Sequence, residues 1–139
     1  MVFVTHFWKK MNENKIASVV IGVAIEVHRQ LGPGLLENVY KECLAHALIE
    51  AGLSVEKEVP VPVIFHDIKL PCGYRIDLLV EGILLIEIKS VERLNDIHIA
   101  QVLTYLKLGD YRLGLLMNFN VLKLKDGFRR LINGQVKET

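Results

Sequence analysis

Residues 74–89 have the sequence YRIDLLVEGILLIEIK, in which apolar side chains alternate on both sides of a short turn. This period of two indicates a pair of strands joined near Glu81-Gly82. Placing Val80 opposite Leu84 collects the apolar alternates of both strands on one face and leaves a three-residue loop, a common hairpin length. A register shifted by one residue would mix apolar and charged side chains on each face. The sequence therefore predicts an antiparallel hairpin with one wholly apolar face.

The other face of this hairpin carries charged residues. The same register places Asp77 opposite Glu87 and Arg75 opposite Lys89. Two opposed carboxylates repel, so the pair costs stability unless a cation lies between them. Carboxylate oxygens are ligands that Mg²⁺ or Mn²⁺ prefers, and the Lys89 ammonium is placed to orient a water molecule or neutralise a phosphate. The hairpin alone leaves a second interpretation open, a solvated sheet face with Arg75 and Lys89 as counter-charges.

Helical and strand periods continue on both sides of the hairpin, with Gly and Pro at the boundaries. The predicted helices span residues 14–31, 36–51 and 96–108, and the predicted strands span residues 55–59, 61–65, 68–70, 74–80, 83–90, 112–119 and 121–125. This order predicts an α+β domain over residues 14–132, with a mixed, mainly antiparallel sheet flanked by helices. A flexible lead-in over residues 1–13 and a frayed tail over residues 133–139 complete the chain.

The third predicted helix carries a polar stripe on an otherwise apolar surface. His98, Gln101 and Tyr105 lie at positions i, i+3 and i+7, so they share one face of the helix. Because this helix follows the Glu87–Lys89 strand after a short loop, it is able to bring the stripe beside the carboxylates. An exposed helix face is the alternative. Glu37 is a second acidic candidate, although the helix macrodipole favours an acid in a first turn without any function.

Composition excludes several classes of protein. The chain has 139 residues, 51% apolar and 24% charged, and a formal net charge of +1, which indicates one globular domain and not a strongly basic nucleic-acid coat. The two cysteines form no CxxC pair and the histidines form no HExxH motif, so a thiolate or histidine zinc site is not supported. The longest apolar run, residues 16–25, is about half of the ~20 residues that span a bilayer. We expect a soluble, cytoplasmic protein.

With these positions in hand, the chain resembles the GxxExxY protein family, a branch of the PD-(D/E)xK nuclease superfamily. The matching segments are Gly34-Leu35-Leu36-Glu37-Asn38-Val39-Tyr40, Gly73-Tyr74-Arg75-Ile76-Asp77-Leu78-Leu79-Val80, Glu87-Ile88-Lys89, Gln101-Val102-Leu103-Thr104-Tyr105 and Asn118-Phe119-Asn120. The resemblance covers about residues 14 to 132. One departure is Ile76, which stands where the superfamily's name expects proline.

The resemblance implies a restriction-endonuclease-like core and a site on it. Its implied metal ligands are Glu37, Asp77 and Glu87, and its implied catalytic lysine is Lys89. Gln101 and Tyr105 would shape the site or contact the nucleic-acid backbone. We expect Arg75 and His98 to do the same from their places beside the carboxylates.

Two classes of function follow. The first is a nuclease that depends on Mg²⁺ or Mn²⁺ and hydrolyses phosphodiester bonds of nucleic acid, with DNA favoured over RNA. The second is a non-catalytic nucleic-acid-binding or protein-interaction module on the same fold. The intact set of acids with Lys89 favours the nuclease. An exposed apolar sheet edge would also support a homodimer, and no membrane association is expected.

Overall fold

The computed structural model describes residues 12–134, which form three helices and a five-stranded sheet. The elements in chain order are α2 (Glu13–Leu31), α3 (Glu37–Glu50), β1 (Val55–Phe65), β2 (Ile68–Val80), β3 (Leu84–Lys89), α4 (Asp96–Gly109), β4 (Leu113–Asn118), the short 3₁₀ helix η1 (Leu124–Gly127) and β5 (Phe128–Ile132). The sheet order is β1-β2-β3-β4-β5, and only the β3–β4 pairing is parallel. The predicted α+β fold with a mixed, mainly antiparallel sheet is confirmed.

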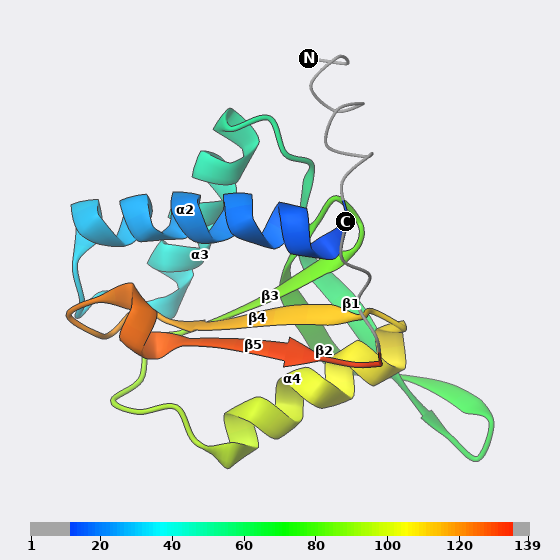
Figure 1. The fold of residues 1–139 in the computed structure, drawn as a ribbon. Helices are drawn as coiled ribbons and strands as arrows, with labels where there is room; N and C mark the ends of the chain where they lie inside the picture. Colours follow the sequence, from blue (N-terminus) through cyan, green and yellow to red (C-terminus); the bar gives the residue numbers. More distant parts are fainter. Residues whose placement is uncertain (1–11, 135–139) are drawn as a thin grey trace.

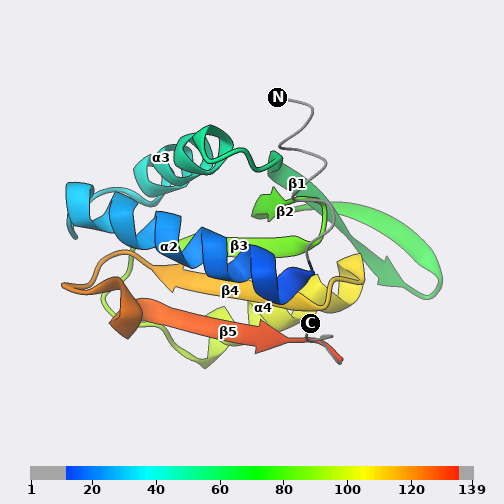
Figure 2. The ribbon, with the colours of Figure 1, turned by 45° about the horizontal axis from the view of Figure 1, so that its top comes forward.

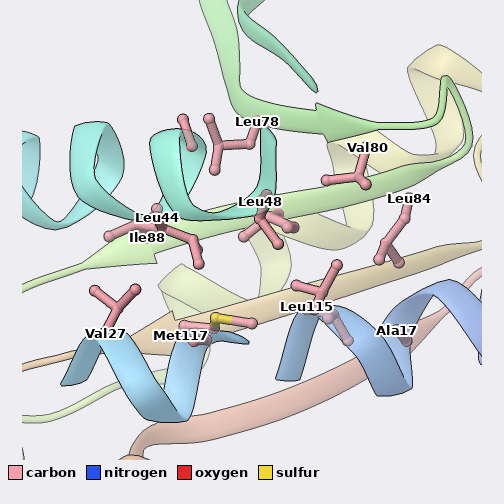
Figure 3. Packing of buried hydrophobic residues seen from close by; sticks show 14 of the residues in the cluster. Ala17, Val27, Leu44, Leu48, Leu78, Val80, Leu84, Ile88, Leu115 and Met117 are labelled. Atoms are coloured by element: carbon pink, nitrogen blue, oxygen red, sulfur yellow. The ribbon is translucent and has the colours of Figure 1, made fainter. Parts of the chain in front are cut away.

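Helices cover both faces of the sheet. Helices α2 and α3 lie on one face and α4 lies on the other (Figures 1 and 2). The larger cluster of buried side chains fills the space between α2, α3 and the sheet, where Ala17, Leu44 and Leu48 face Leu78 and Leu115 (Figure 3). A smaller cluster lies under α4 and includes Val102, Leu106, Leu85 and Leu116. Since both faces are covered, β3 and β4 are buried along nearly their whole length.

The predicted register of the central hairpin is confirmed. Val80 pairs with Leu84 and Leu78 with Ile86 in an antiparallel ladder. The turn between them is left-handed at Gly82, where φ is 70°. The alternation of apolar side chains is sufficient to specify this pairing, because a one-residue slip would send the buried set to the opposite face.

The predicted apolar face does not extend past Asp77. Leu78 packs among the side chains under α2 and α3, whereas Ile76 packs with Leu85 under α4. On the neighbouring strand, Glu58 lies between the partners of Leu78 and Ile76 and has a φ of 56°. This left-handed residue twists the β1–β2 ribbon. As a result, Leu78 and Ile76, which are two residues apart on β2, point to opposite faces of the sheet. The expectation that Ile76 shares a face with Leu78 is therefore wrong.

The predicted opposition of Arg75 and Lys89 is also wrong. The β2–β3 ladder ends at the pair formed by Leu78 and Ile86, and beyond it Arg75 is paired with Pro60 of β1. From this point β1 and β2 continue as a two-stranded arm that extends past the rest of the sheet (Figures 1 and 2).

The first part of the sheet consists of two long strands, β1 and β2, where four short strands over residues 55–59, 61–65, 68–70 and 74–80 were predicted. The register of β1 against β2 shifts between Val61 and Val63, because Pro62 faces the three residues 71–73. Pro62 and Pro71 have no amide hydrogen to donate to the ladder, which locates this bulge without ending either strand.

The last strand lies later in the chain than predicted. Residues 121–125 form a bend and part of η1, Leu122 is 88% exposed, and β5 begins at Phe128, the partner of Met117. The chain must reverse before it can pair with β4, and alternation alone gives no sign of that requirement. At Gly127 the backbone comes so close to the Asn118 carbonyl that a side chain would not fit.

The predicted lead-in and tail fall partly within the described residues. Asn12 caps α2 by accepting from the Lys15 amide at 3.0 Å, so residues 12 and 13 of the predicted lead-in belong to the start of this helix, and residues 1–11 lie outside the described residues. Asn133 is held by a 2.8 Å bond from its amide to the Arg112 carbonyl, so it is not frayed. Residues 135–139 also lie outside the described part. Within residues 12–134, no helix is both long and apolar enough to cross a membrane.

Candidate active site

Asp77 and Glu87 meet where the β2–β3 ladder ends. The Asp77 amide donates to Glu87 Oε1 at 3.0 Å, and the Ile88 amide donates to Asp77 Oδ2 at 2.8 Å. Each side chain thus bonds to the backbone of the opposite strand in place of a regular ladder bond. This exchange fixes both carboxylates and brings them together, as the hairpin register predicts.

Burial raises the pKa of both carboxyl groups. The pKa of Asp77 rises to about 6, mainly because the group is withdrawn from water. The pKa of Glu87 rises to about 8, first through burial and then through the negative charge of Asp77. Glu87 is only 4% exposed, so the alternative of a solvated, counter-charged sheet face does not hold. Two buried carboxylates this close retain a proton near neutral pH unless a cation replaces it.

Lys89 is linked to the polar stripe of α4. Its ammonium donates to Gln101 Oε1 at 3.1 Å, and Gln101 Nε2 donates to the Tyr105 hydroxyl at 3.0 Å. The Tyr105 ring is buried, and burial followed by the charge of Glu87 raises its pKa. Two of the three residues in the stripe predicted on the third helix therefore lie beside the carboxylates, and these two, Gln101 and Tyr105, fix the direction of the Lys89 ammonium.

Glu37 approaches this pair from α3 without joining it closely. It is exposed in the first turn of the helix, and its negative charge contributes to the raised pKa of both Asp77 and Glu87. Within residues 12–134, no three His, Cys, Asp or Glu side chains are gathered tightly enough to hold a metal ion by themselves. The structure thus brings Asp77 and Glu87 together, whereas Glu37 lies at the edge of the site and acts on both carboxyl groups through its charge.

Arg75 and His98 lie outside the hydrogen-bonded residues of the site, which are Asp77, Glu87, Lys89, Gln101 and Tyr105. Arg75 is exposed on the arm, beyond the end of the β2–β3 ladder. His98 belongs to the N-terminal cap of α4, where its Nδ1 accepts from the Asn95 amide at 3.1 Å and Asn95 Oδ1 accepts from the His98 amide. A capping role accounts for His98, and contact of either residue with a substrate stays a prediction.

Sequence reasoning missed Lys41 and Glu58, which form an ion pair beside the site. The bond to Glu58 raises the pKa of Lys41, and the positive charge of Lys41 opposes the rise in the pKa of Asp77. Lys41 follows Glu37 by one helical turn, which is a signal that the sequence contains. The place of Glu58 depends on the β1–β2 register, which the separate short strands did not reveal.

The comparison with protein families identifies the superfamily of the chain. A family model described as the PD-(D/E)XK nuclease superfamily matches residues 14–131, nearly the whole described region. The chain belongs to this superfamily. Membership in the PD-(D/E)XK nuclease superfamily indicates a nuclease-type function. The comparison with curated proteins found no match, and the comparison with solved structures found none either.

Proposed function

We propose that this PD-(D/E)XK superfamily member is a Mg²⁺- or Mn²⁺-dependent nuclease that hydrolyses phosphodiester bonds, with DNA favoured over RNA. The single observation that carries the proposal is the buried pair of Asp77 and Glu87, hydrogen-bonded to each other's strands, with the Lys89 ammonium on the same side. Burying two like charges side by side is costly, and a divalent cation offsets that cost.

The donor set suits a hard divalent cation. Each carboxylate uses one oxygen to accept a backbone N–H, and no bond within the described residues occupies the other oxygen of Asp77 or Glu87. These two oxygens would hold the ion, with Glu37 as a third ligand from the edge of the site. Water molecules would complete the coordination shell, as is usual for Mg²⁺. A divalent cation bound here supplies charge neutralisation at the phosphate and makes water a better nucleophile.

The remaining chemistry belongs to the side chains of the chain. Lys89 Nζ, held by Gln101, donates a hydrogen bond to the attacking water or to a phosphate oxygen and offsets the negative charge that develops there. Tyr105 holds the Gln101 amide in the orientation that leaves its oxygen for Lys89. Gln101 and Tyr105 are therefore positioning residues, and Lys89 is the proposed catalytic residue.

Membership in the GxxExxY branch is part of the proposal and is supported by the turn before α3. Tyr40 Oη donates to the Gly32 carbonyl and accepts from the Leu35 amide, which closes the loop that leads to Glu37. Gly34 has a φ of 94°, a conformation that favours glycine. The glycine and the tyrosine of the motif thus position its glutamate.

The test combines metal binding with cleavage. We expect calorimetry to show Mn²⁺ and Mg²⁺ binding to the wild type, with Asp77→Asn and Glu87→Gln each abolishing it. Plasmid DNA, single-stranded DNA and RNA are then incubated with each ion, and Lys89→Ala should bind the ion without cleaving. Glu50→Gln, which changes an exposed glutamate far along α3, is the matched control. Nucleic-acid binding without cleavage under all conditions would instead support the non-catalytic module.

A cytoplasmic location and a homodimer are further parts of the proposal. Cys43 and Cys72 are both free thiols, which suits a reducing compartment. The arm exposes Ile64, Phe65 and Ile68, an apolar group that a second copy is able to cover. Sedimentation velocity of the wild type against Ile64→Ser tests the dimer, and a monomeric wild type contradicts it.

A further inference from the structure

The β1–β2 arm carries two hollows that share one side chain. The exposed Tyr74 lines both hollows, and one of them also contains Gln101 and Tyr105 of the candidate active site. The bulge at residues 71–73 and the register shift opposite Pro62 separate the two strands at this point, which accounts for the second hollow. The arm is thus continuous with the proposed site and not a separate surface.

The hollow beside the site is lined mainly by apolar and aromatic side chains. It has a volume of about 400 Å³ and is lined by Val63, Tyr74, Ile97, Ala100, Gln101, Thr104, Tyr105 and Leu108. The Tyr74 and Tyr105 rings are tilted by 53° with their centroids 6.0 Å apart, so they do not cover each other's faces. Tyr74 is 48% exposed, which leaves its ring accessible to a ligand.

The hollow on the arm has a different character. It has a volume of about 640 Å³, and its lining includes two cations, Lys69 and Arg75, but no acid. Prolines at positions 60, 62 and 71 line the rest of it with Val61, Cys72, Gly73 and Tyr74. Cations beside an exposed aromatic ring are the combination with which proteins bind unpaired nucleic-acid strands.

We propose that the arm binds a single-stranded segment of nucleic acid that leads into the site, with one base against Tyr74 and backbone phosphates at Arg75 and Lys69. This inference rests on the proposed function, whose substrate class it narrows to strands with unpaired nucleotides. A paired base offers neither face to a tyrosine ring, because its neighbours in the duplex cover both. The phosphate contacts supply affinity, and the stacking on Tyr74 supplies the preference for single strands.

The direct test measures binding of short oligothymidine with a fluorescent label to the full chain in EDTA, where no cleavage occurs. The single strand should bind at least tenfold more tightly than a duplex of the same length. Tyr74→Ala should weaken oligothymidine binding about tenfold, and Tyr74→Phe should retain it. Arg75→Ala should lower the slope of log K against log salt by about one.

Matched variants separate this surface from others. Phe65→Ala removes an aromatic ring that is 59% exposed on the same arm but lines neither hollow, and it should leave binding unchanged. Arg129→Ala removes an exposed cation on β5 and should also leave the salt slope unchanged. Equal affinity for the duplex, or equal losses for Phe65→Ala and Tyr74→Ala, overturns the inference.

The native cysteines provide a second measurement that needs no variant. Cys72 is exposed in the arm hollow, whereas Cys43 lies on α3 outside it. Bound oligothymidine should slow alkylation of Cys72 several-fold and leave Cys43 unaffected, and an unchanged Cys72 rate counts against the inference. A wild type that binds oligothymidine through Tyr74 but cleaves nothing overturns only the proposed function. A wild type that cleaves duplex DNA and is indifferent to Tyr74→Ala overturns only this inference.

Discussion

Asp77 and Glu87 both hold the hairpin together and carry carboxyl groups whose charged form is disfavoured by burial. Each accepts a backbone N–H from the other's strand, so both contribute to the end of the hairpin. Each is also held where burial disfavours its charged form. Replacing either acid by its amide keeps an acceptor oxygen for the backbone bond and removes the charge, which makes the cost of that charge measurable.

We predict that Glu87→Gln stabilises the metal-free protein at alkaline pH. The pKa of Glu87 is raised to about 8 in the folded state from 4.5, so the folded wild type binds more protons and loses stability as pH rises through this range. The variant should therefore gain on the wild type by roughly 1 kcal/mol per pH unit between about pH 5 and pH 8. Urea unfolding in EDTA across this range measures the difference.

Glu50→Gln is the control for this experiment, because Glu50 is exposed and pairs with the exposed His46 at the end of α3. Its stability relative to the wild type should not depend on pH in the same range. A constant difference between Glu87→Gln and the wild type would mean that the folded protein does not raise the pKa of Glu87.

We predict that the Tyr105 hydroxyl affects the cleavage rate only by positioning Gln101 and, through it, Lys89. Tyr105→Phe removes the acceptor of Gln101 Nε2, so the amide that holds Lys89 is free to rotate. We expect the cleavage rate to fall about threefold to tenfold, the equivalent of one hydrogen bond, with Mn²⁺ affinity unchanged. Tyr111→Phe, which removes a hydroxyl from the same apolar cluster under α4, should leave the rate unchanged. A loss of Mn²⁺ affinity in Tyr105→Phe would contradict the positioning role.

Side-chain neighbours were predictable where a single strand pair or helix specifies them. Alternation along the hairpin brings Asp77 to Glu87, and helical spacing brings Gln101 to Tyr105. Glu58 was not predictable in the same way, because its place depends on a left-handed residue and a bulge that alternation does not encode. Lys41 was not predicted either, because its role depends on its ion pair with Glu58.

At the scale of single elements, the loop before α3 carries more of the site than its length suggests. Helix α3 has no side-chain cap at its start, so the chain relies on Tyr40, whose hydroxyl bonds to both sides of the loop. The Tyr40 ring is buried and stacks on Phe119 with the centroids 4.7 Å apart. The position of Glu37 therefore depends on a side chain one turn further along the helix.

We predict that Tyr40→Phe loosens this loop without emptying the core. The ring and its stacking remain, but the Gly32 carbonyl and the Leu35 amide lose their partner. The free energy of unfolding should fall by about 1–2 kcal/mol, and the affinity for Mn²⁺ should fall through the displacement of Glu37. Urea unfolding and calorimetry measure the two effects, with Tyr111→Phe again as the control. An unchanged Mn²⁺ affinity would show that Glu37 does not depend on this loop.

The prediction of elements succeeded for helices and failed for the last strand for one physical reason. A helix is specified by local spacing and by caps such as Asn95, which the sequence shows directly. The residues 121–125 alternate as a strand does, but the antiparallel pairing of Met117 with Phe128 requires the intervening chain to turn back. Pairing partners far along the chain decide strands, and no local pattern reveals them.

At the scale of the whole molecule, the site exists because helices cover both faces of the sheet. Helix α4 covers the face of the sheet opposite to α2 and α3 (Figure 2). Its Gln101 and Tyr105 complete the surroundings of Lys89. The β2–β3 ladder ends where the β1–β2 arm begins, so the end of the ladder lies next to the arm. The hairpin sequence could predict the charged pair, but only the packed helices turn it into a buried site.

The charged pair leads to a prediction for the whole fold in the presence of metal. Protons and a divalent cation compete for Asp77 and Glu87, whose pKa values are raised to about 6 and about 8. Mn²⁺ should therefore stabilise the protein more at about pH 8 than at about pH 6, because fewer protons must leave. At a hundredfold excess over Kd, the gain is about 2.7 kcal/mol, or roughly 9 °C in Tm for a chain of 139 residues. Thermal unfolding with and without Mn²⁺ at the two pH values measures it, and Asp77→Asn should remove the shift at both. An equal shift in Asp77→Asn would place the ion elsewhere on the molecule, and a larger shift at the lower pH would contradict proton competition at this pair.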